Sequence, residues 1–332
     1  MGTHASAPSV GAGRFAPTPT GHLHLGNART ALLAWLAARR QGLRNVLRVE
    51  DLDPKAIPSG CLEGQYTDLD WLGLIYDEGP RVGGPVGPYR QSERFHLYDG
   101  VLEQLNQMGL LYPCWCSRKE IQMALVAPHA GDEGPVYPGT CRPTVPATLT
   151  DLNALPTRRD RRPALRINTQ AAMDHLGMRL VEFDDLIAGP QRFDVIRQMG
   201  DFVVRRVDGV AAYQIACSWD DVAMNCTLVL RGSDLLPSTA RQWLLLTLLG
   251  QELPNYAHTG LVMNRDGARL AKRDGAIALH QLRADGVSAE KVVTYLAEIS
   301  GLPATSNLDD LTNALNISRL SASNVCLHEG LG

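Results

Sequence analysis

The chain has 332 residues, which corresponds to about two domains of roughly 150 residues each. Hydrophobic residues make up 45% of it and charged residues 20%, as in ordinary globular proteins, and the formal net charge of −3 excludes a surface coated with positive charge. A nucleic-acid ligand stays compatible with this balance, because such binding depends on a local basic stripe and not on the total charge.

We expect no signal peptide at residues 1–13 and no membrane span among the apolar runs. Residues 1–13 lack the apolar segment of a signal peptide, and the longest apolar run, residues 31–38, is far too short to span a bilayer. We therefore expect a cytoplasmic protein without a membrane partner. In that reducing compartment the seven cysteines are expected to be buried thiols or metal ligands and not disulfides.

The first predicted elements form a strand, a rigid turn and a helix. A short strand ends near Phe15 and runs into a turn that holds Pro17 and Pro19. Residues 28–40 are predicted to be helical because their apolar side chains recur on one face, and a second strand is predicted at residues 45–50. The short connections predict a right-handed βαβ unit with parallel strands, and a helix start after such a turn is typical of a phosphate site.

Later elements are predicted from the same periodicities. The strands at 202–207 and 210–216 flank Asp208 and Gly209, a dipeptide typical of a hairpin turn. The tail from Asn316 is polar and has no clear element. Helices are predicted at residues 62–72, 95–108, 239–249 and 289–299, and further strands at residues 165–167, 180–183 and 228–230.

Residues 14–27 read RFAPTPTGHLHLGN and form the most informative stretch of the chain. A histidine pair such as His22 and His24 can also belong to a plain surface turn. The segment, however, resembles the first signature of the class I aminoacyl-tRNA synthetases that use glutamate and glutamine. The resemblance implies an α/β fold with a Rossmann-type parallel sheet, in which His24, Gly26 and Asn27 bind ATP and His24 donates to a phosphate oxygen.

A cluster of cysteines is the second feature with chemical meaning. Cys114 and Cys116, with Cys141 further on, could hold a metal ion, while free thiols on a loop are the alternative. The spacing resembles the Cys-x-Cys…Tyr-x-x-x-Cys zinc pattern of short glutamate-activating synthetases. It implies one structural Zn²⁺ per chain, held by Cys114, Cys116, Tyr137 and Cys141. Tyr137 could instead be a packed ring beside the site.

A third set of residues suits a glutamate ligand. Glu50 could accept the ammonium group, and Arg14 or Arg231 could bind the side-chain carboxylate, although each residue alone could equally be an ordinary ion-pair partner. Residues 48–53, 212–216 and 230–234 resemble segments that line the amino-acid pocket in glutamate synthetases. The resemblance implies that glutamate contacts Arg14, Ala16, Thr18, Glu50, Tyr213 and Arg231.

Residues 269–273 read RLAKR and resemble the Lys-Met-Ser-Lys-Ser loop, the second signature of class I. Arg269 stands in place of the first lysine and Ala271 in place of the serine, whereas Lys272 is retained. The resemblance implies that Lys272 is catalytic and contacts ATP, whose phosphates Mg²⁺ would bridge. A basic surface turn is the alternative.

The resemblance also predicts how the chain is divided. Only about 60 residues follow the second signature, which is too few for an anticodon-binding domain. The predicted segments are a mobile N-terminus (1–12), a first Rossmann half (13–110), an inserted zinc or acceptor-type subdomain (111–195), a second Rossmann half (196–252), and a signature loop with a small helical C-terminal region (253–332).

A chain with the activation residues and no anticodon reader resembles the short paralogues of the glutamate enzymes. The resemblance implies activation of L-glutamate by ATP without tRNA, and transfer of glutamate to queuosine in the anticodon loop of tRNA(Asp). The alternatives are a truncated conventional glutamate–tRNA ligase, a non-catalytic RNA-binding paralogue and another nucleotidyltransferase. An arginine cluster could face the nucleic acid or could be a solvated loop: Arg158, Arg159, Arg161 and Arg162.

Overall fold

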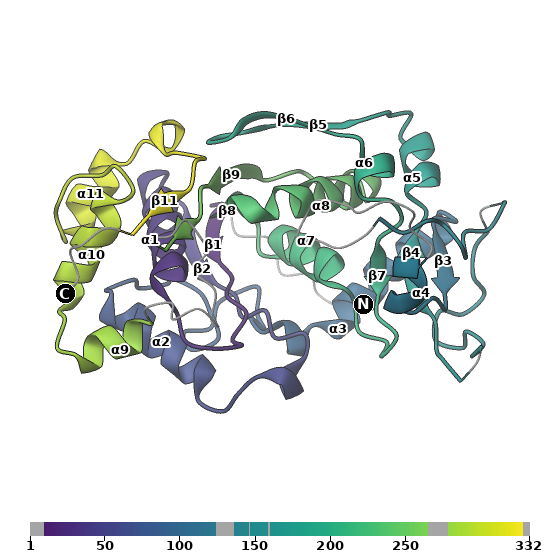
Figure 1. Cartoon of the computed structure of the whole chain (residues 1–332), viewed down its shortest axis with the longest axis horizontal. Helices are drawn as coiled ribbons and strands as arrows, with labels where there is room; N and C mark the ends of the chain where they lie inside the picture. The colour runs from purple at the N-terminus through teal and green to yellow at the C-terminus, as the bar shows by residue number, and fades with distance from the viewer. Residues whose placement is uncertain (1–9, 124–135, 146, 159, 265–277, 328–332) are drawn as a thin grey trace.

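The structure is a computed structural model, and it describes residues 10–123, 136–145, 147–158, 160–264 and 278–327. A parallel four-stranded sheet forms its centre (Figure 1). The strands lie in the order β2 (Arg44–Leu47), β1 (Ala12–Phe15), β8 (Cys226–Gly232) and β9 (Asn255–Thr259). Helix α1 (Leu25–Arg40) connects β1 to β2 and packs against the sheet, so that its small and apolar side chains are buried. The carboxyl ends of β1 and β8 therefore open at the same edge, where α/β sheets bind ligands.

A second region, on the right of Figure 1, is built around antiparallel strands β3 (Leu111–Cys114), β4 (Ala164–Ile167) and β7 (Val203–Arg205). Its core is shared with helices α3 (Phe95–Gln107), α7 (Tyr213–Ala223) and α8 (Leu236–Leu248). The remaining helices of the first two thirds of the chain are α2 (Cys61–Trp71), α4 (Arg118–Met123), α5 (Thr169–His175) and α6 (Val195–Gln198).

A long hairpin joins the two regions. Strands β5 (Val181–Asp185) and β6 (Gly189–Phe193) pair with each other and run along the top of Figure 1 toward β9. The amide of Leu186, at the tip of this hairpin, donates to the carbonyl of Tyr256 in β9 at 2.8 Å. The hairpin thereby carries Asp185 from the second region to the central sheet.

The C-terminal part of the chain covers α1. Helices α10 (Ala289–Glu298) and α11 (Leu308–Ala314) contribute Val292, Leu296 and Leu311 to the core that α1 shares with the sheet. Helix α9 (Leu279–Ala284) lies beside α2, and β10 (Val262–Met263) pairs in parallel with β11 (Val325–Cys326).

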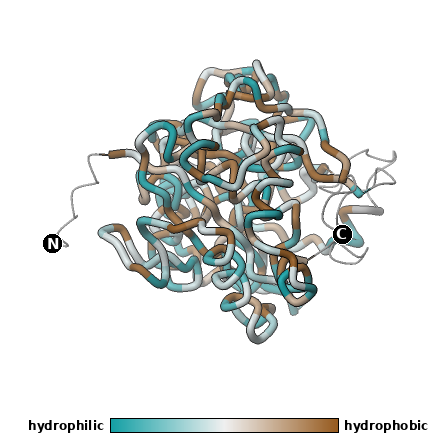
Figure 2. The backbone as a smooth tube through the Cα atoms, turned by 90° about the vertical axis from the view of Figure 1, so that its left-hand side faces the viewer, coloured by the Kyte–Doolittle hydropathy of each residue, from teal (hydrophilic) through white to brown (hydrophobic). Residues whose placement is uncertain are grey.

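Apolar and hydrophilic stretches alternate along the whole tube in Figure 2, and no large region is uniformly apolar. In the part of the chain that the structure describes, none of the helices has the length and apolar composition needed to cross a bilayer.

The structure confirms the α/β class and the parallel βαβ unit at the start of the chain. It also corrects one predicted strand. The turn at Asp208 and Gly209 exists, but only a single bridge from Arg205 to Ala211 follows it, and residues 213–223 form α7 instead of a strand. Ile215, Ala216 and Trp219 lie on one face at helical spacing, and all three belong to or pack against the apolar core of the second region.

Five strands in the described part of the chain were not predicted from the sequence, namely β3, β6, β9, β10 and β11. Strand β9 was taken for a loop, because its residues Asn-Tyr-Ala-His-Thr do not show the alternation of a half-buried strand. Strand β11 lies in the tail that was expected to have no element, and only its pairing with β10 defines it.

Candidate active site

The turn after β1 is built around His24, which caps α1. Its Nδ1 accepts hydrogen bonds from the amides of Gly26 (3.0 Å) and Asn27 (3.3 Å), and the Asn27 side chain accepts from the His24 amide at 3.5 Å. Because Nδ1 accepts, the ring proton lies on Nε2, which is then a donor. The helix begins at Leu25, earlier than predicted, so Gly26 and Asn27 belong to its first turn.

Gly26 is required by this arrangement. A Cβ at this position would lie 2.9 Å from Cε1 of His24 and 3.0 Å from Nδ1, which is closer than real Cβ contacts. The glycine therefore lets the imidazole lie flat over the helix N-terminus.

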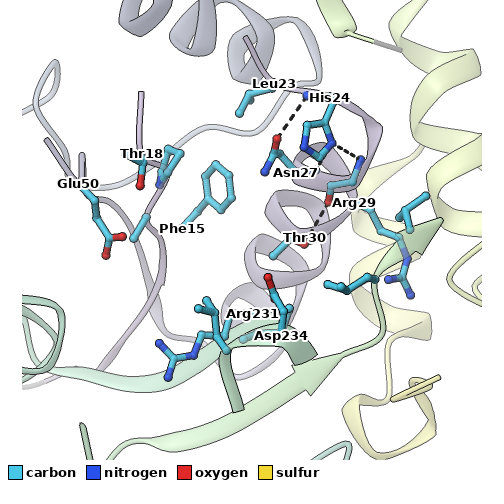
Figure 3. A pocket seen from close by; sticks show the side chains of 18 of the residues that line it. Phe15, Thr18, Leu23, His24, Asn27, Arg29, Thr30, Glu50, Arg231 and Asp234 are labelled. Carbon is cyan, nitrogen blue, oxygen red and sulfur yellow. Dashed lines mark hydrogen bonds between the residues drawn. The ribbon is translucent and has the colours of Figure 1, made fainter. Parts of the chain in front are cut away.

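One cavity of about 410 Å³ opens at this turn. In Figure 3, Glu50 lies at one side of the view, and His24 and Asn27 lie at the other. The cavity is lined by every predicted ATP and glutamate residue that the structure describes, namely Arg14, Ala16, Thr18, His24, Gly26, Asn27, Glu50, Tyr213 and Arg231. Lys272 and Arg269 lie outside the described residues.

At the Glu50 side, two arginines and two acids form a buried network. Asp221 of α7 binds Arg14 at 3.2 Å and Arg48 at 2.6 Å, and Arg48 also binds Glu50 at 3.0 Å. Burial alone would raise the pKa of Asp221, but Arg14 and Arg48 outweigh it and hold the pKa below its ordinary value. Arg14 is therefore already neutralised by a protein carboxylate.

Arg231 is in a different situation. The residue is 3% exposed, and its hydrogen-bond partners are neutral: Nε donates to Nε2 of His258 at 3.1 Å, and Nη2 donates to Oγ1 of Thr239 and Oε1 of Gln242, both at 2.7 Å. Among the residues that the structure describes, no carboxylate forms an ion pair with it. A buried cation that faces a cavity without a counter-ion is energetically costly, and an anionic ligand would lower that cost.

Sequence reasoning missed the groups that hold this network together. Arg48 begins the segment 48–53 that was expected to line the pocket, but no role was assigned to it, and Asp221 shows no signal beyond its charge. Thr239 and Gln242 lie inside a helix that was predicted only for its apolar face. His258 could not be identified because β9 was not predicted. The hydroxyl of Tyr213 was predicted to be in the site, and burial raises its pKa well above the ordinary value, so it remains a donor at neutral pH.

The predicted metal ligands come together in the second region. The Sγ atoms of Cys114, Cys116 and Cys141 all lie within 4.8 Å of one another, with 3.6 Å between Cys116 and Cys141. The Tyr137 hydroxyl lies 3.4 Å from Sγ of Cys114 and 3.6 Å from Sγ of Cys116. Tetrahedral Zn²⁺ with bonds of about 2.3 Å to sulfur and 2.0 Å to oxygen requires S–S distances of roughly 3.8 Å and S–O distances of roughly 3.5 Å. The cluster could thus hold a metal ion.

The predicted arginine loop is exposed. The Arg158 guanidinium lies 3.9 Å above the Trp115 ring, and Arg161 forms an ion pair with Glu120 at 3.3 Å. Arg159 lies outside the described residues.

A parallel sheet, a capped helix start after its first strand and a buried arginine at the same sheet edge are features typical of nucleotide-using α/β enzymes. Residues 12–325 match the family model described as tRNA synthetases class I (E and Q), catalytic domain. The chain belongs to this family, and the protein is a ligase of the aminoacyl-tRNA synthetase type.

Curated relatives fall in two groups. The chain is 50% identical over 312 residues to a Glutamyl-Q tRNA(Asp) synthetase of Symbiobacterium thermophilum, which covers 93% of each protein, and 46% identical to one of Nitratidesulfovibrio vulgaris, which covers 87% of this chain and 86% of the relative. It is 44% identical to Glutamate–tRNA ligase 1 of Halorhodospira halophila, over 90% of this chain but 60% of that protein. Among solved structures, a glutamate-tRNA synthetase from Elizabethkingia anophelis matches with a TM-score of 0.77 and 26% identity, over 96% of this chain and 68% of the other.

Proposed function

We propose that the protein activates L-glutamate with ATP in the absence of tRNA and transfers the glutamate to queuosine in the anticodon loop of tRNA(Asp). One observation carries the glutamate assignment: the buried, uncompensated guanidinium of Arg231 lies in the same cavity as Glu50 and the His24 turn. Because these substrates are a nucleotide and a tRNA, the proposal also implies a cytoplasmic protein.

The proposed roles follow from charge. The side-chain carboxylate of glutamate binds Arg231, and its ammonium binds the Glu50 carboxylate, which Arg48 holds in place at 3.0 Å. Arg14 stays paired with Asp221, so Arg231 is the better of the two predicted carboxylate partners. Ala16, Thr18 and Tyr213 would complete the lining, with the Tyr213 hydroxyl as a neutral donor.

At the other side of the cavity, Nε2–H of His24 and the first turn of α1 face the triphosphate. The glutamate α-carboxylate forms a bond to the α-phosphorus of ATP as the bond to pyrophosphate breaks, and His24 stabilises the charge that develops on phosphate oxygens. A ribose-like hydroxyl of the RNA then attacks the carbonyl carbon, and AMP leaves. Gly26, Asn27 and Lys272 are proposed to contact ATP, with which Mg²⁺ would bind.

The choice among glutamate enzymes rests on the similarity to named relatives. Relatives named Glutamyl-Q tRNA(Asp) synthetase are 50% and 46% identical to this chain, and the glutamate–tRNA ligase is 44% identical. The higher identity to the first group supports the queuosine substrate over a conventional ligase. The buried cation of the site supports an enzyme over a non-catalytic RNA-binding paralogue.

The discriminating experiment is glutamate-dependent ATP–pyrophosphate exchange, followed by transfer of labelled glutamate. We expect exchange with no RNA present, and transfer to tRNA(Asp) that contains queuosine but not to the same tRNA with guanosine at that position. Exchange that requires tRNA(Glu), or labelling of a 3′ end, would support the conventional ligase. His24→Ala should reduce exchange by about 10²- to 10³-fold, the usual cost of losing one transition-state donor.

We also propose that the cluster of Cys114, Cys116, Tyr137 and Cys141 holds one structural zinc ion. Without a cation, burial raises the pKa of the Cys116 thiol to about 11, and Zn²⁺ would supply the charge that stabilises thiolates. Bound zinc would cross-link β3 to the loop at residues 136–141, and with four protein ligands it would leave no position for a substrate.

For the RNA, another cavity, of about 350 Å³, is proposed to take part of the anticodon loop. The start of α7 contributes to both cavities, since Tyr213 lines the first and the next residue, Gln214, lines the other. Arg166 and Arg241 line it too, and each guanidinium lies over an aromatic ring, an arrangement suited to unstacked bases and phosphates. Arg241→Ala should raise the KM for tRNA and leave exchange without RNA unchanged.

A further inference from the structure

Arg231 is oriented by residues that are distant in the sequence. Its Nε–H points at Nε2 of His258 in β9, and the other ring nitrogen of His258 lies 2.5 Å from Oδ2 of Asp185 at the end of β5. The side chains of His258 and Asp185 are fully buried. A continuous chain of hydrogen bonds therefore leads from the β5–β6 hairpin to the guanidinium at the cavity.

The chemistry of this chain fixes one tautomer of His258. Burial lowers the pKa of His258 to about 4 despite the nearby carboxylate of Asp185, so the ring is neutral at pH 7 and carries a single N–H. Asp185 stays ionised, since burial is outweighed by hydrogen bonds that lower its pKa. A carboxylate can only accept, so the proton lies on Nδ1, and Nε2 offers its lone pair to Arg231.

Backbone hydrogen bonds fix the orientation of the Asp185 carboxylate. Its Oδ1 accepts the backbone amides of Ile187 (3.0 Å), Ala188 (2.8 Å) and His258 (3.0 Å), so only Oδ2 faces the imidazole. On the far side, Nη2 of Arg231 is held by two neutral acceptors, and its Nη1 has only a contact of 4.0 Å to Sγ of Cys217. The plane of the guanidinium is thus set, and Nη1 is left for a ligand.

We propose that Asp185 and His258 are positioning residues that hold Arg231 in the orientation that binds the side-chain carboxylate of glutamate, and that they thereby contribute to the choice of glutamate over glutamine. This inference rests on the proposed function. Either oxygen of a carboxylate can accept from Nη1 and its charge balances the guanidinium, whereas glutamine brings no charge and its amide has a single acceptor oxygen. An Nη1 that no longer points at the ligand loses part of this advantage.

Asp185→Asn is the sharpest test, because it changes one atom. The three backbone amides keep the asparagine oxygen at the Oδ1 position, so its NH₂ faces Nδ1 of His258. The ring must then accept at Nδ1 and carry its proton on Nε2, which lies 3.1 Å from Nε of Arg231 and 2.8 Å from Oγ1 of Thr239. The Nε–H of Arg231 loses its acceptor and faces another donor, and the new Nε2–H competes with Nη2 of Arg231 for the Thr239 oxygen, so Arg231 loses its orientation.

We expect D185N to raise the KM for glutamate about tenfold or more in the RNA-free exchange assay, with kcat and the KM for ATP within about threefold of the parent enzyme, an effect typical of supporting residues. Discrimination against glutamine should fall with it. The ¹⁵N shifts of the His258 ring should show the proton on Nδ1 in the parent and on Nε2 in D185N. Glu182→Gln, which neutralises an exposed carboxylate on the same strand, is the control and should behave as the parent.

A second pair of variants separates orientation from folding. His258→Gln keeps an acceptor that can reach Nε–H of Arg231 and should restore much of the glutamate affinity that His258→Leu loses. A D185N enzyme with parental KM for glutamate, or with an equal loss for ATP, would overturn the inference and leave the proposed function standing. Absence of glutamate-dependent exchange in the parent enzyme would instead remove the proposed function itself.

Discussion

The buried arginines on the two sides of the glutamate end of the cavity differ in whether their charge is balanced by protein carboxylates. On one side, Arg14 and Arg48 share the carboxylates of Asp221 and Glu50, so the charges are balanced within the protein. On the other side, Arg231 has only neutral partners among the described residues. The paired arginines contribute to the stability of the fold, whereas Arg231 is suited to bind a ligand. A buried charge without a partner is costly until an anion binds.

The largest expected effect is on activity. Arg231→Gln should lower kcat/KM for glutamate by about 10²- to 10³-fold, since it removes a cation that has no counter-ion among the described residues and the ligand carboxylate would be buried without this partner. The melting temperature should not fall, because a costly buried charge is removed. Exchange kinetics and calorimetry on the same variant measure the activity and the melting temperature. A variant that unfolds would contradict the view that Arg231 is not needed for stability.

The balanced side should respond in the opposite way. Arg14→Gln leaves Asp221 buried with one partner fewer, and should lower the free energy of unfolding by about 3 kcal/mol at pH 7. Because the pKa of Asp221 is held below its ordinary value of 3.8, this contribution is present at neutral pH and is lost as the pH falls below about 4. Denaturant titration measures the change.

The matched control for this variant is Arg192→Gln. Its partner Glu182 lies closer, at 2.6 Å against 3.2 Å between Arg14 and Asp221, but both side chains are more than half exposed. Its removal should change the free energy of unfolding by less than about 1 kcal/mol. An equal loss in the two variants would mean that burial does not distinguish these pairs.

His258 provides a pH-dependent version of the same comparison. Its pKa falls from 6.5 to about 4 on folding, so between these values the unfolded chain binds a proton that the folded chain excludes. The free energy of unfolding should therefore decrease as the pH is lowered from about 6.5 to 4, by about 3 kcal/mol from this group. His258→Gln should show a flatter profile in this window, and parallel profiles for the two proteins would contradict the low pKa.

The smallest effect on glutamate activation is expected at the cysteine cluster. Metal analysis should find about one zinc per chain, and Cys141→Ser should lower the zinc content and the melting temperature while changing the KM for glutamate little. Cys326→Ser, which alters an exposed cysteine far along the chain, is the control. Full zinc content in the Cys141→Ser protein would refute the proposed ligand set.

Parts of the fold and of the candidate site could be predicted from the sequence, because their signals are local. The βαβ unit and the capped turn at His24 depend on residues that are neighbours in the chain, and the spacing of Cys114 and Cys116 predicted a cluster that the structure also brings together. One local prediction was wrong. Residues 210–216 follow a turn and show a short alternation, which predicted a strand, and only the longer run to Ala223 shows that the segment forms a helix.

The sequence by itself determined the family, the phosphate-binding turn and the residue types of the site, because each lies in a contiguous segment whose pattern is specific. Only the tertiary structure decided which arginine is free for a ligand. The partner that neutralises Arg14 is 207 residues away, and Asp185 lies 73 residues before the histidine that it orients. Charge balance in a buried site depends on which side chains lie next to one another in the folded protein, and the local sequence pattern does not contain that information.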